Sequence, residues 1–401
     1  MTRVAIVVVV ALVCAANGYA SEGKAVPLQA IEGYALARSY APGQVARVEL
    51  LGHAAGARVA VFHAGFEHSN RVPSRELLGA PVAARVVVTP GEARIAVGQW
   101  QSGLYFARIT APAGHAYAPF VVRPRRLGEQ RIAVVLPTNT WAAYNFRDAN
   151  RDGVGDTWYA DPRLDVELDR PFQGHGVPPH YAAYDLLFLR WLARTAKNVD
   201  VLTDDDLERV HDGAQLARAY DLVVFSGHHE YVTTHEYDVT QAYRDHGGNL
   251  MFLSANNFFY RVVRTGSVLH RVGRWRDLGR PEAALVGVQY LDWNHDEFGN
   301  GAYVLRSSGW PFTGTGLQAG SSFGTYGIEI DAPTKDSPRG LRILATVPNL
   351  FGPGRSANMT YYTTPRGAKV FAAGTINFGG TALWPPVPTI LENVWDELAQ
   401  P

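Results

Sequence analysis

Residues 223–231 read Val-Val-Phe-Ser-Gly-His-His-Glu-Tyr, and residues 247–257 read Gly-Gly-Asn-Leu-Met-Phe-Leu-Ser-Ala-Asn-Asn. Each stretch contains a short apolar run without helical periodicity, which is typical of a buried strand. Each run then ends in small or polar residues, at Gly227 and at Ser254. Ligands of open α/β sheets bind beyond the carboxyl ends of parallel strands. We therefore expect the polar residues that follow both strands to meet in one crevice.

The segments around these two stretches alternate between strand-like and helix-like patterns. Further buried strands are predicted at residues 132–136, 199–202 and 370–373. Helices are predicted at residues 181–195, 234–246 and 390–398. Strands that alternate with helices form parallel sheets through right-handed crossovers. The sequence therefore predicts an α/β domain over residues 127–401 with a mostly parallel sheet.

The first part of the chain has a different pattern, in which short strands follow one another between Gly and Pro turns. Strands are predicted at residues 45–50, 58–62, 84–88, 105–110 and 119–122. Alternation of apolar and polar residues at regular spacing favours a β-sandwich, which we place at residues 21–126. The fold class expected for the whole chain is thus α+β, with a sandwich domain followed by an α/β domain.

Length and charge limit the kinds of partner that we expect. A chain of 401 residues exceeds what one hydrophobic core usually covers, which also favours two domains. Lys plus Arg and Asp plus Glu both number 37, so the formal net charge is zero. A nucleic-acid partner would call for a basic stripe. We expect a small-molecule substrate instead, and assembly into a homo-oligomer stays open.

The first 20 residues are predicted to be a signal peptide. Arg3 precedes an apolar run at residues 4–16, and small residues lead to Ala20. The run is too short to predict a membrane span. It also contains the only cysteine, Cys14. A mature chain beginning after Ala20 would be a periplasmic or secreted protein without disulfides and outside the membrane.

His228 and Glu230 form the first candidate site, directly after a predicted buried strand. Glu230 could ligate a metal or act as a base, and His228 could bind metal, move protons or donate to an oxyanion. The competing interpretation is a structural hydrogen-bonded cluster at a sheet edge. Because burying a charge without a partner is costly, we favour the functional interpretation. His229 is the weaker candidate, since its side chain should point away from these two.

The segment at residues 139–145, Asn-Thr-Trp-Ala-Ala-Tyr-Asn, follows the strand predicted at residues 132–136 and so lies at the same edge. On the residues alone, Tyr144 is more often a packing residue than a functional one. A polar loop then runs over residues 145–171. Its oxygen-bearing side chains have the spacing that begins a calcium loop: Asp148, Asn150, Asp152 and Asp156. The twelfth position is Tyr159 instead of Glu, which favours a solvated Asx-turn loop over a calcium site.

Several common catalytic motifs are not found in the sequence. There is no Gly-x-Ser-x-Gly elbow before a helix, no Gly-rich phosphate loop and no His-Glu-x-x-His pattern. A mature chain without cysteine also lacks the nucleophile of the usual glutamine amidotransferases. Three kinds of function are still compatible with the sequence: metal-assisted hydrolysis, carboxylate-based hydrolysis and binding without catalysis.

Motifs along the chain resemble, in order, those of N,N-dimethylformamidase large (beta) subunit-like proteins. They lie at residues 100–108, 120–124, 139–145, 170–172, 227–231, 247–250, 256–261, 314–317 and 374–377. The resemblance covers residues 39–398. It implies a β-sandwich joined to an α/β domain of amidotransferase-like topology, and hydrolysis of amide-type C–N bonds. The signal peptide is a difference from that family, and the chain contains no small subunit, so dimethylformamide is not carried over as the substrate.

The resemblance also implies a mononuclear iron, bound by two tyrosines and one glutamate. Carried over by motif, Tyr144 and Glu230 would be two of the ligands. Tyr159 is our choice for the second tyrosine, with Tyr181 and Tyr184 as fallbacks. His228 and Asn256 would position substrate or assist the site, and Glu329 would be a late acidic residue that manages protons. Phenolate and carboxylate oxygens are hard ligands that suit Fe(III).

Three hypotheses follow from the sequence. The first is an exported amide hydrolase with a mononuclear metal. The second is an exported binding protein without catalysis, whose sandwich recognises a glycan or a protein. The third is a scaffold stabilised by calcium at the loop of Asp148 to Asp156.

Overall fold

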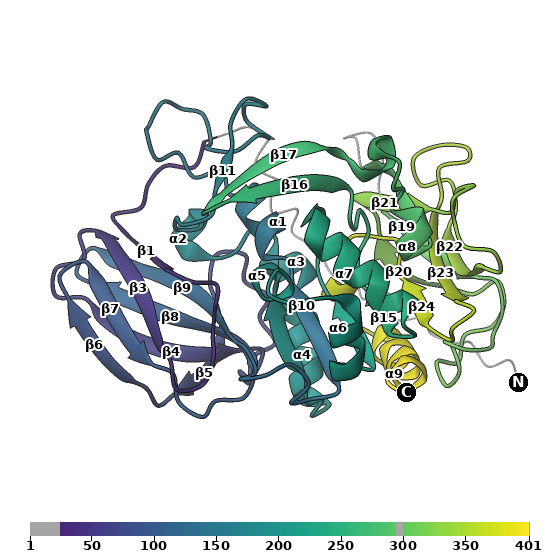
Figure 1. Cartoon of the computed structure of the whole chain (residues 1–401), viewed down its shortest axis with the longest axis horizontal. Helices are drawn as coiled ribbons and strands as arrows, with labels where there is room; N and C mark the ends of the chain where they lie inside the picture. The colour runs from purple at the N-terminus through teal and green to yellow at the C-terminus, as the bar shows by residue number, and fades with distance from the viewer. Residues whose placement is uncertain (1–24, 294–299, 401) are drawn as a thin grey trace, which may run out of the picture.

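The computed structural model of the chain describes residues 25–293 and 300–400. The predicted signal peptide lies outside these residues, so export stays a prediction. Figure 1 shows the strands of the first hundred or so residues gathered at one end, beside a larger mixed sheet with helices. In the described part of the chain, no helix has the length and apolar character needed to cross a membrane.

Residues 31–122 form two sheets that share one hydrophobic core. The first has the order β1 (Ile31–Ala35), β3 (Val45–Gly52), β7 (Glu92–Ala96), β6 (Arg85–Thr89). The second has the order β2 (Ser39–Tyr40), β9 (Gly114–Val122), β8 (Gly103–Ala111), β4 (Arg58–Ala64), β5 (Gly79–Val82). Val48 from one sheet and Ile109 from the other are fully buried in that core. Alternate residues of β3 point inward, as expected for the sandwich.

A nine-stranded sheet forms the centre of the remaining described chain. Its order is β12 (Asp200–Thr203), β10 (Ile132–Leu136), β13 (Leu222–Phe225), β15 (Asn249–Phe252), β24 (Lys369–Ala372), β23 (Ala357–Thr363), β22 (Arg342–Val347), β19 (Gly301–Leu305), β20 (Ser322–Tyr326). Neighbouring strands from β12 to β24 pair in parallel. Neighbours from β24 to β20 pair antiparallel.

The fold is therefore mixed α+β, and the sheet is mixed where we expected it to be mostly parallel. The expectation holds for β12, β10, β13, β15 and β24, which are almost completely buried and of which the first four are joined through helices. It fails for the last strands because loops without helices connect β22, β23 and β24, and such short connections join antiparallel strands. The amidotransferase-like topology stays a prediction.

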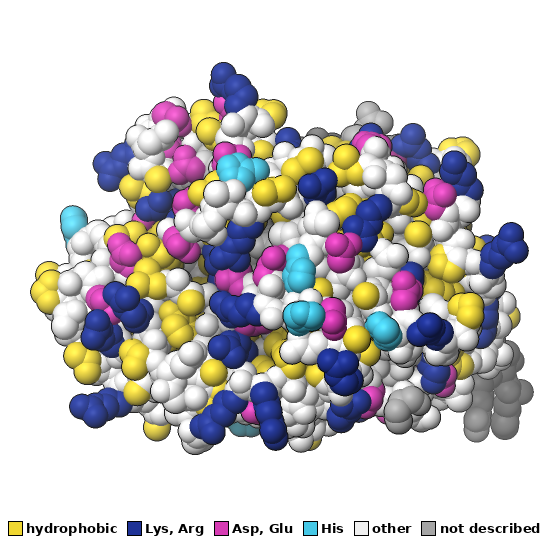
Figure 2. Space-filling view, in the orientation of Figure 1, with side chains coloured by type: hydrophobic (Ala, Val, Ile, Leu, Met, Phe, Trp, Pro, Cys, Tyr) yellow, Lys and Arg dark blue, Asp and Glu magenta, His cyan; other side chains and the backbone are white. Residues whose placement is uncertain are grey.

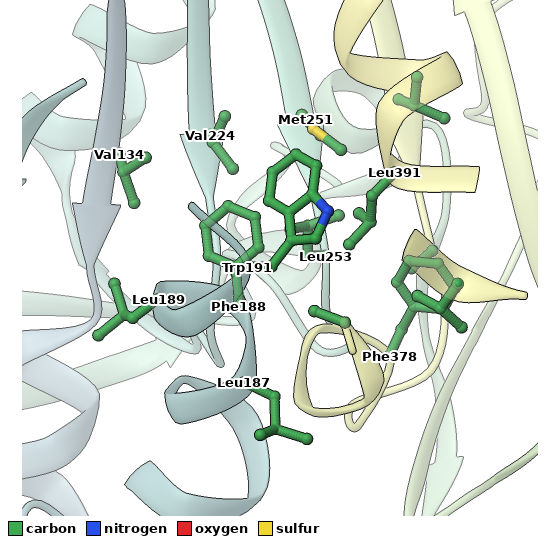
Figure 3. Packing of buried hydrophobic residues seen from close by; sticks show 14 of the residues in the cluster. Val134, Leu187, Phe188, Leu189, Trp191, Val224, Met251, Leu253, Phe378 and Leu391 are labelled. Atoms are coloured by element: carbon green, nitrogen blue, oxygen red, sulfur yellow. The ribbon is translucent and has the colours of Figure 1, made fainter. Parts of the chain in front are cut away.

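Helices cover both faces of the parallel half. One face packs against α4 (Leu186–Arg194) and α9 (Val387–Leu398), and the other against α6 (Gly213–Ala219) and α7 (Thr234–Asp245). Figure 3 shows Trp191 of α4 among the strand residues Val134, Val224 and Met251 and Leu391 of α9. Such close-packed aromatic and aliphatic side chains fix the helices against the sheet.

The helix predicted at residues 181–195 is divided in two. The first piece is α3 (Tyr181–Tyr184), and α4 begins only after Asp185. Asp185 is 1% exposed, and its backbone has a φ of −112°. The remaining helices are α1 (Thr138–Ala143), α2 (Gln173–Gly176), α5 (Asp204–Leu207) and α8 (Ala283–Val286), with 3-10 turns at Trp275–Leu278 and Gly379–Thr381.

Two smaller sheets complete the described fold. One has the order β11 (Val166–Glu167), β17 (Val268–Arg274), β16 (Tyr260–Thr265), β14 (Tyr231–Thr233), and the other pairs β18 (Gln289–Trp293) with β21 (Glu329–Ala332). In Figure 1 the β16–β17 hairpin runs along the top of the molecule, above the central sheet and its helices. Basic and acidic side chains are interspersed over the face in Figure 2, in keeping with the balanced totals of 37 and 37.

Buried polar contacts join the N-terminal sheets to the rest of the chain. Arg147 pairs with Glu32 at 2.7 Å, and Arg190 pairs with Glu67 at 2.6 Å. The hydroxyl of Ser39 donates to Asp206 Oδ1 at 2.7 Å. Because breaking a buried ion pair leaves an uncompensated charge, these contacts fix the two parts against each other.

Candidate metal centre

The candidate site lies where β10 and β13 end, side by side and in parallel register. The segment after β10 forms the short helix α1 and leaves Tyr144 as its C-terminal cap. The turn after β13 is tied to this helix, since the backbone N–H groups of Glu230 and Tyr231 both reach the hydroxyl of Thr140, at 3.1 and 3.3 Å. The two strand ends therefore present Tyr144 and Glu230 to each other.

Gly227 makes the turn after β13 possible. A Cβ atom at this position would lie 2.2 Å from the Oδ1 atom of Asp185, well inside contact distance. The glycine therefore leaves room for a buried carboxyl group directly behind the turn that carries His228 and Glu230.

Two tyrosine hydroxyls converge on one carboxylate oxygen. Tyr144 donates to Glu230 Oε2 at 2.8 Å, and Tyr159 donates to the same atom at 2.9 Å. The two tyrosine rings lie 4.5 Å apart between centroids. Tyr159 lies within the polar loop that follows Tyr144, so the folding of this loop brings the two tyrosines together. Three oxygen-bearing side chains in one buried place are the kind of donors that hard cations prefer.

Burial controls the protonation of this cluster. It raises the pKa of Glu230 to about 7, against hydrogen bonds from tyrosines that lower it. Burial and the negative charge of Glu230 raise the pKa values of Tyr144 and Tyr159 well above their usual 10. Without a cation, both tyrosines thus keep their protons near neutral pH, whereas Glu230 gains and loses its proton in that range.

His228 lies between two carboxyl groups. Its Nε2 atom is 3.4 Å from Glu230 Oε2 and 3.5 Å from Glu329 Oε2. Glu329 begins β21, a strand far away in the sequence. Burial, with His180 and His229 nearby, lowers the pKa of His228 well below 6.5, so the ring is neutral at pH 7. The structure therefore brings His228 and Glu329 together beside Glu230.

Asn256 lies at the end of the neighbouring strand β15 and is 3% exposed. Its backbone N–H donates to Asp331 Oδ1 at 2.8 Å. Its side-chain Oδ1 has no hydrogen-bond partner among the described residues. The structure therefore places Asn256 at the expected sheet edge, with its Oδ1 not hydrogen-bonded to the tyrosine–glutamate cluster.

Strained backbone surrounds this edge of the sheet. His180, Asn256 and Phe258 have φ values of 60°, 53° and 60°, and Ile328 next to Glu329 has a φ of 68°. Left-handed conformations cost roughly 1–3 kcal/mol in non-glycine residues and occur most often at functional sites. A β-branched residue such as Ile328 is especially unfavourable there.

His229 faces away from the cluster, as expected. Its Nε2 atom lies 3.1 Å from the carbonyl oxygen of Val135, and its Nδ1 atom lies 3.9 Å from Asp204. Asp204 in turn accepts from the N–H of Asn139 at 2.6 Å. This arrangement holds the first turn of α1, so His229 and Asp204 support the element that carries Tyr144.

A small cavity of about 10 Å³ opens beside Tyr144 and His228, room for one water-sized group. Its other walls are formed by Thr140, Trp141, Pro179, His180, Tyr184 and Asp185. Asp185 accepts from the indole of Trp141 at 3.3 Å, and burial raises its pKa to about 8. Of the two fallback tyrosines, Tyr184 lines this cavity, whereas Tyr181 is buried in the main core.

Two residues of this region were missed in the sequence. Asp185 interrupts an apolar helical pattern. A carboxyl group among residues expected to be buried is unusual, and this could have marked Asp185 as a candidate. Tyr231 directly follows Glu230, and its hydroxyl contacts the hydroxyl of Tyr159. Adjacency to Glu230 was the only sequence signal for it.

The loop with calcium-like spacing is held by hydrogen bonds to its own backbone. Asp148 accepts from the N–H groups of Asp152 and Gly153 at 3.2 and 3.0 Å, and Asp156 accepts from Ala149 at 2.8 Å. The same loop contains Asx-turn contacts, the alternative that the sequence favoured: Asn150 accepts from the N–H of Asp152 at 3.0 Å, and Asp152 accepts from that of Val154 at 2.8 Å. Within the described residues, no group of three or more His, Cys, Asp or Glu side chains is arranged to hold a metal ion. Calcium binding here stays a prediction.

These features define a mixed α+β protein with paired N-terminal sheets and a buried tyrosine–carboxylate site at strand ends. The chain belongs to the N,N-dimethylformamidase beta subunit-like family, whose C-terminal family model matches residues 89–384. Curated relatives include the N,N-dimethylformamidase beta subunits of Paracoccus aminophilus and of Alcaligenes sp., each 27% identical over 201 residues. The match covers 40% of this chain and 26% of each relative, so it spans about a quarter of their length.

Solved structures similar to this chain match only a small part of it. The M1 domain from titin covers 24% of this chain and 95% of its own, with 11% identity and a TM-score of 0.18. Titin M4 covers 23% of this chain and 96% of its own, with 19% identity and a TM-score of 0.17. Likeness at this level supports no inference about function.

Proposed function

We propose that this chain is a hydrolase of non-peptide amide C–N bonds, with a mononuclear Fe(III) held by Tyr144, Tyr159 and Glu230. The observation that carries the proposal is the convergence of both tyrosine hydroxyls on Glu230 Oε2, at 2.8 and 2.9 Å. Family membership supports the amide class, because the relatives are named N,N-dimethylformamidase beta subunits. Export through residues 1–20 and an amidotransferase-like topology of the parallel half are part of the same proposal.

The residues fit the proposed metal. The donor set consists of two phenol oxygens and one carboxylate, which are hard ligands suited to a hard trivalent cation. In the structure, the phenol protons point at the carboxylate oxygen, so a cation replacing them would satisfy the same three oxygen atoms. The two phenolates and the carboxylate would then carry three negative charges, which balance the three positive charges of Fe(III). A bound Fe(III) supplies Lewis acidity, which polarises a carbonyl and acidifies water.

His228 and Glu329 would manage protons during hydrolysis. Since burial keeps His228 neutral at pH 7, its Nε2 atom can accept a proton from an attacking water molecule. The carboxyl group of Glu329, 3.5 Å away, can hold or return that proton as the amine leaves. Asn256 would orient the substrate through its buried amide.

The size of the cavity favours a substrate with a small group at this position. Room for one water-sized group beside Tyr144 and His228 excludes bulky substituents from that position. The aromatic walls from Trp141 and Tyr184 would contact apolar groups, and Asp185 offers one hydrogen-bonding carboxyl. A short-chain amide fits these limits better than a peptide.

Metal analysis and a visible spectrum test the proposal. Full-length protein is loaded with Fe(III), and bound iron and the tyrosinate charge-transfer band are measured in wild type, Tyr144→Phe and Glu230→Gln. Tyr34→Phe is the matched control. Tyr34 also donates to a glutamate, Glu49, at 2.8 Å, but it belongs to β1 in the N-terminal sheets and not to the candidate site. We expect one iron and a visible band in wild type and control, and loss of both in the two site variants. Fully folded wild type that binds no iron would overturn the proposal and favour binding without catalysis.

A further inference from the structure

A third tyrosine contacts the proposed ligand set. Tyr231 directly follows Glu230, begins β14 and is 1% exposed. Its hydroxyl contacts the hydroxyl of Tyr159. Tyr159 uses its own proton in the bond to Glu230 Oε2, at 2.9 Å. Either hydroxyl can donate in the contact between the two tyrosines, but a Tyr159 that has given up its proton to a cation could only accept, which leaves Tyr231 as the donor.

The position of the Tyr231 ring is fixed by the surrounding packing. The ring of Tyr231 stacks on Tyr260 of β16 at 5.4 Å, with the two planes within 3° of parallel. The ring of Trp158, the residue before Tyr159, lies 4.9 Å from the ring of Tyr231 between centroids. The guanidinium of Arg271 lies over both Trp158 and Tyr260, at 5.6 and 5.2 Å from the ring centroids. A ring held by these contacts can present its hydroxyl in only one direction.

We propose that Tyr231 is a positioning residue that donates a hydrogen bond to the phenolate oxygen of Tyr159 and thereby tunes it as an iron ligand. The inference rests on the proposed function and concerns a residue that this function does not require. Tyr231 keeps its proton, whereas Tyr159 gives up its own when the cation binds. The contact in the structure thus becomes a charge-assisted hydrogen bond, which is stronger than a neutral one.

Such a bond would make Tyr159 differ from Tyr144 in its charge-transfer energy and in how firmly its ring is held. Hydrogen bonding to a phenolate stabilises the electrons that the oxygen shares with the cation, so charge transfer from Tyr159 needs more energy. It also holds the ring of Tyr159 at a set angle, as supporting partners of metal ligands generally do. Loss of such a supporting partner typically lowers metal affinity by about 10–100-fold.

Tyr231→Phe tests this role, because it removes the hydroxyl and keeps the stacked ring. In the full chain loaded with Fe(III), we expect one bound iron per chain, an affinity lowered by about 10–100-fold and a band at longer wavelength. Tyr260→Phe is the matched control, since it removes a hydroxyl from the ring stacked on Tyr231 in β16. This control should leave the band and the affinity unchanged.

Three other outcomes would contradict the proposal, and each would identify a different error in it. An unshifted band with unchanged affinity in Tyr231→Phe would show that the hydroxyl does not act on Tyr159. Loss of iron as complete as in Tyr159→Phe would make Tyr231 a ligand in its own right. Absence of iron and band in wild type would refute the proposed function and this inference together, whereas failure confined to the variant refutes the role of Tyr231 alone.

Discussion

Arg147 and Glu32 form a buried ion pair across 115 positions of sequence. Arg147 Nε lies 3.2 Å from both carboxylate oxygens, and Nη2 lies 2.7 Å from Oε2. Glu32 belongs to β1, whereas Arg147 lies in the loop between Tyr144 and Tyr159. Val26 adds a backbone bridge to the same arginine. The first strand of the N-terminal sheets therefore holds the loop that separates the two proposed tyrosine ligands.

Glu32→Gln should destabilise the protein by about 3–5 kcal/mol, because it leaves Arg147 buried without a counter-charge. Urea unfolding of the metal-free protein measures this loss. Glu92→Gln is the matched control, since the Arg47–Glu92 pair lies at the surface, where water and salt screen the attraction, and should contribute far less to stability. Equal losses in the two variants would contradict the anchoring role of Glu32. We also expect weaker iron binding in Glu32→Gln and unchanged binding in the control.

Iron uptake should release more protons at low pH than at high pH. Both tyrosines must lose a proton at any pH in the working range, because burial holds their pKa values well above 10. Glu230, with a pKa of about 7, carries a further proton below that pH and none above it. We expect release of about three protons per iron at pH 5.5 and about two at pH 8.5, since ligands must be deprotonated to bind. Proton release that does not vary with pH would exclude Glu230 from the ligand set.

Asp185→Asn should make the metal-free protein more stable than wild type at alkaline pH. Burial raises the pKa of folded Asp185 from 3.8 to about 8, so the folded state retains a proton that the unfolded state loses. The stability from this proton is complete below pH 3.8 and is lost as pH rises towards 8. Relative to wild type, the variant should gain on the order of 3–4 kcal/mol between pH 5 and pH 8, at 1.36 kcal/mol per unit. Urea unfolding of both proteins at the two pH values measures the gain, and a difference independent of pH would show that Asp185 is ionised in the folded protein.

His228→Gln and Glu329→Gln should lower kcat on a small amide by about 10²–10⁴-fold, the usual contribution of a general acid or base. Iron content and the visible band should stay at the wild-type level, because neither residue belongs to the proposed ligand set. Steady-state kinetics together with metal analysis separates the two effects. A variant that loses its iron would instead identify the substituted residue as a ligand.

The fold was predictable where burial alone determines the local pattern. The strands expected at residues 132–136 and 222–225 match β10 and β13 in full, since both runs are apolar throughout. The antiparallel half was not predictable, because the direction of pairing depends on connections between segments far apart in sequence. The β16–β17 hairpin was missed because Arg261, Arg264 and Arg271 interrupt its apolar alternation.

The candidate site was predictable in part, and mainly through family resemblance. Spacing alone indicated His228 and Glu230, but nothing local pairs Tyr144 with Tyr159 across the polar loop. The structure brings these four residues together, and their roles towards a metal stay predictions. Tyr231 and Asp185 were not predicted as site residues, because each is placed in the site by a contact that only the folded chain makes. Tyr231 contacts the hydroxyl of Tyr159, and Asp185 packs against the turn at Gly227.

The ion pair between Arg190 and Glu67 limits how this protein can be divided or recombined. Arg190 is 1% exposed on α4, and its counter-charge comes from the N-terminal sheets. A chain cut before residue 127 would deprive both Arg190 and Arg147 of the carboxylates that they pair with. The N-terminal sheets are therefore not an exchangeable module, and a chimera carrying a foreign sandwich would have to supply both acidic residues in place.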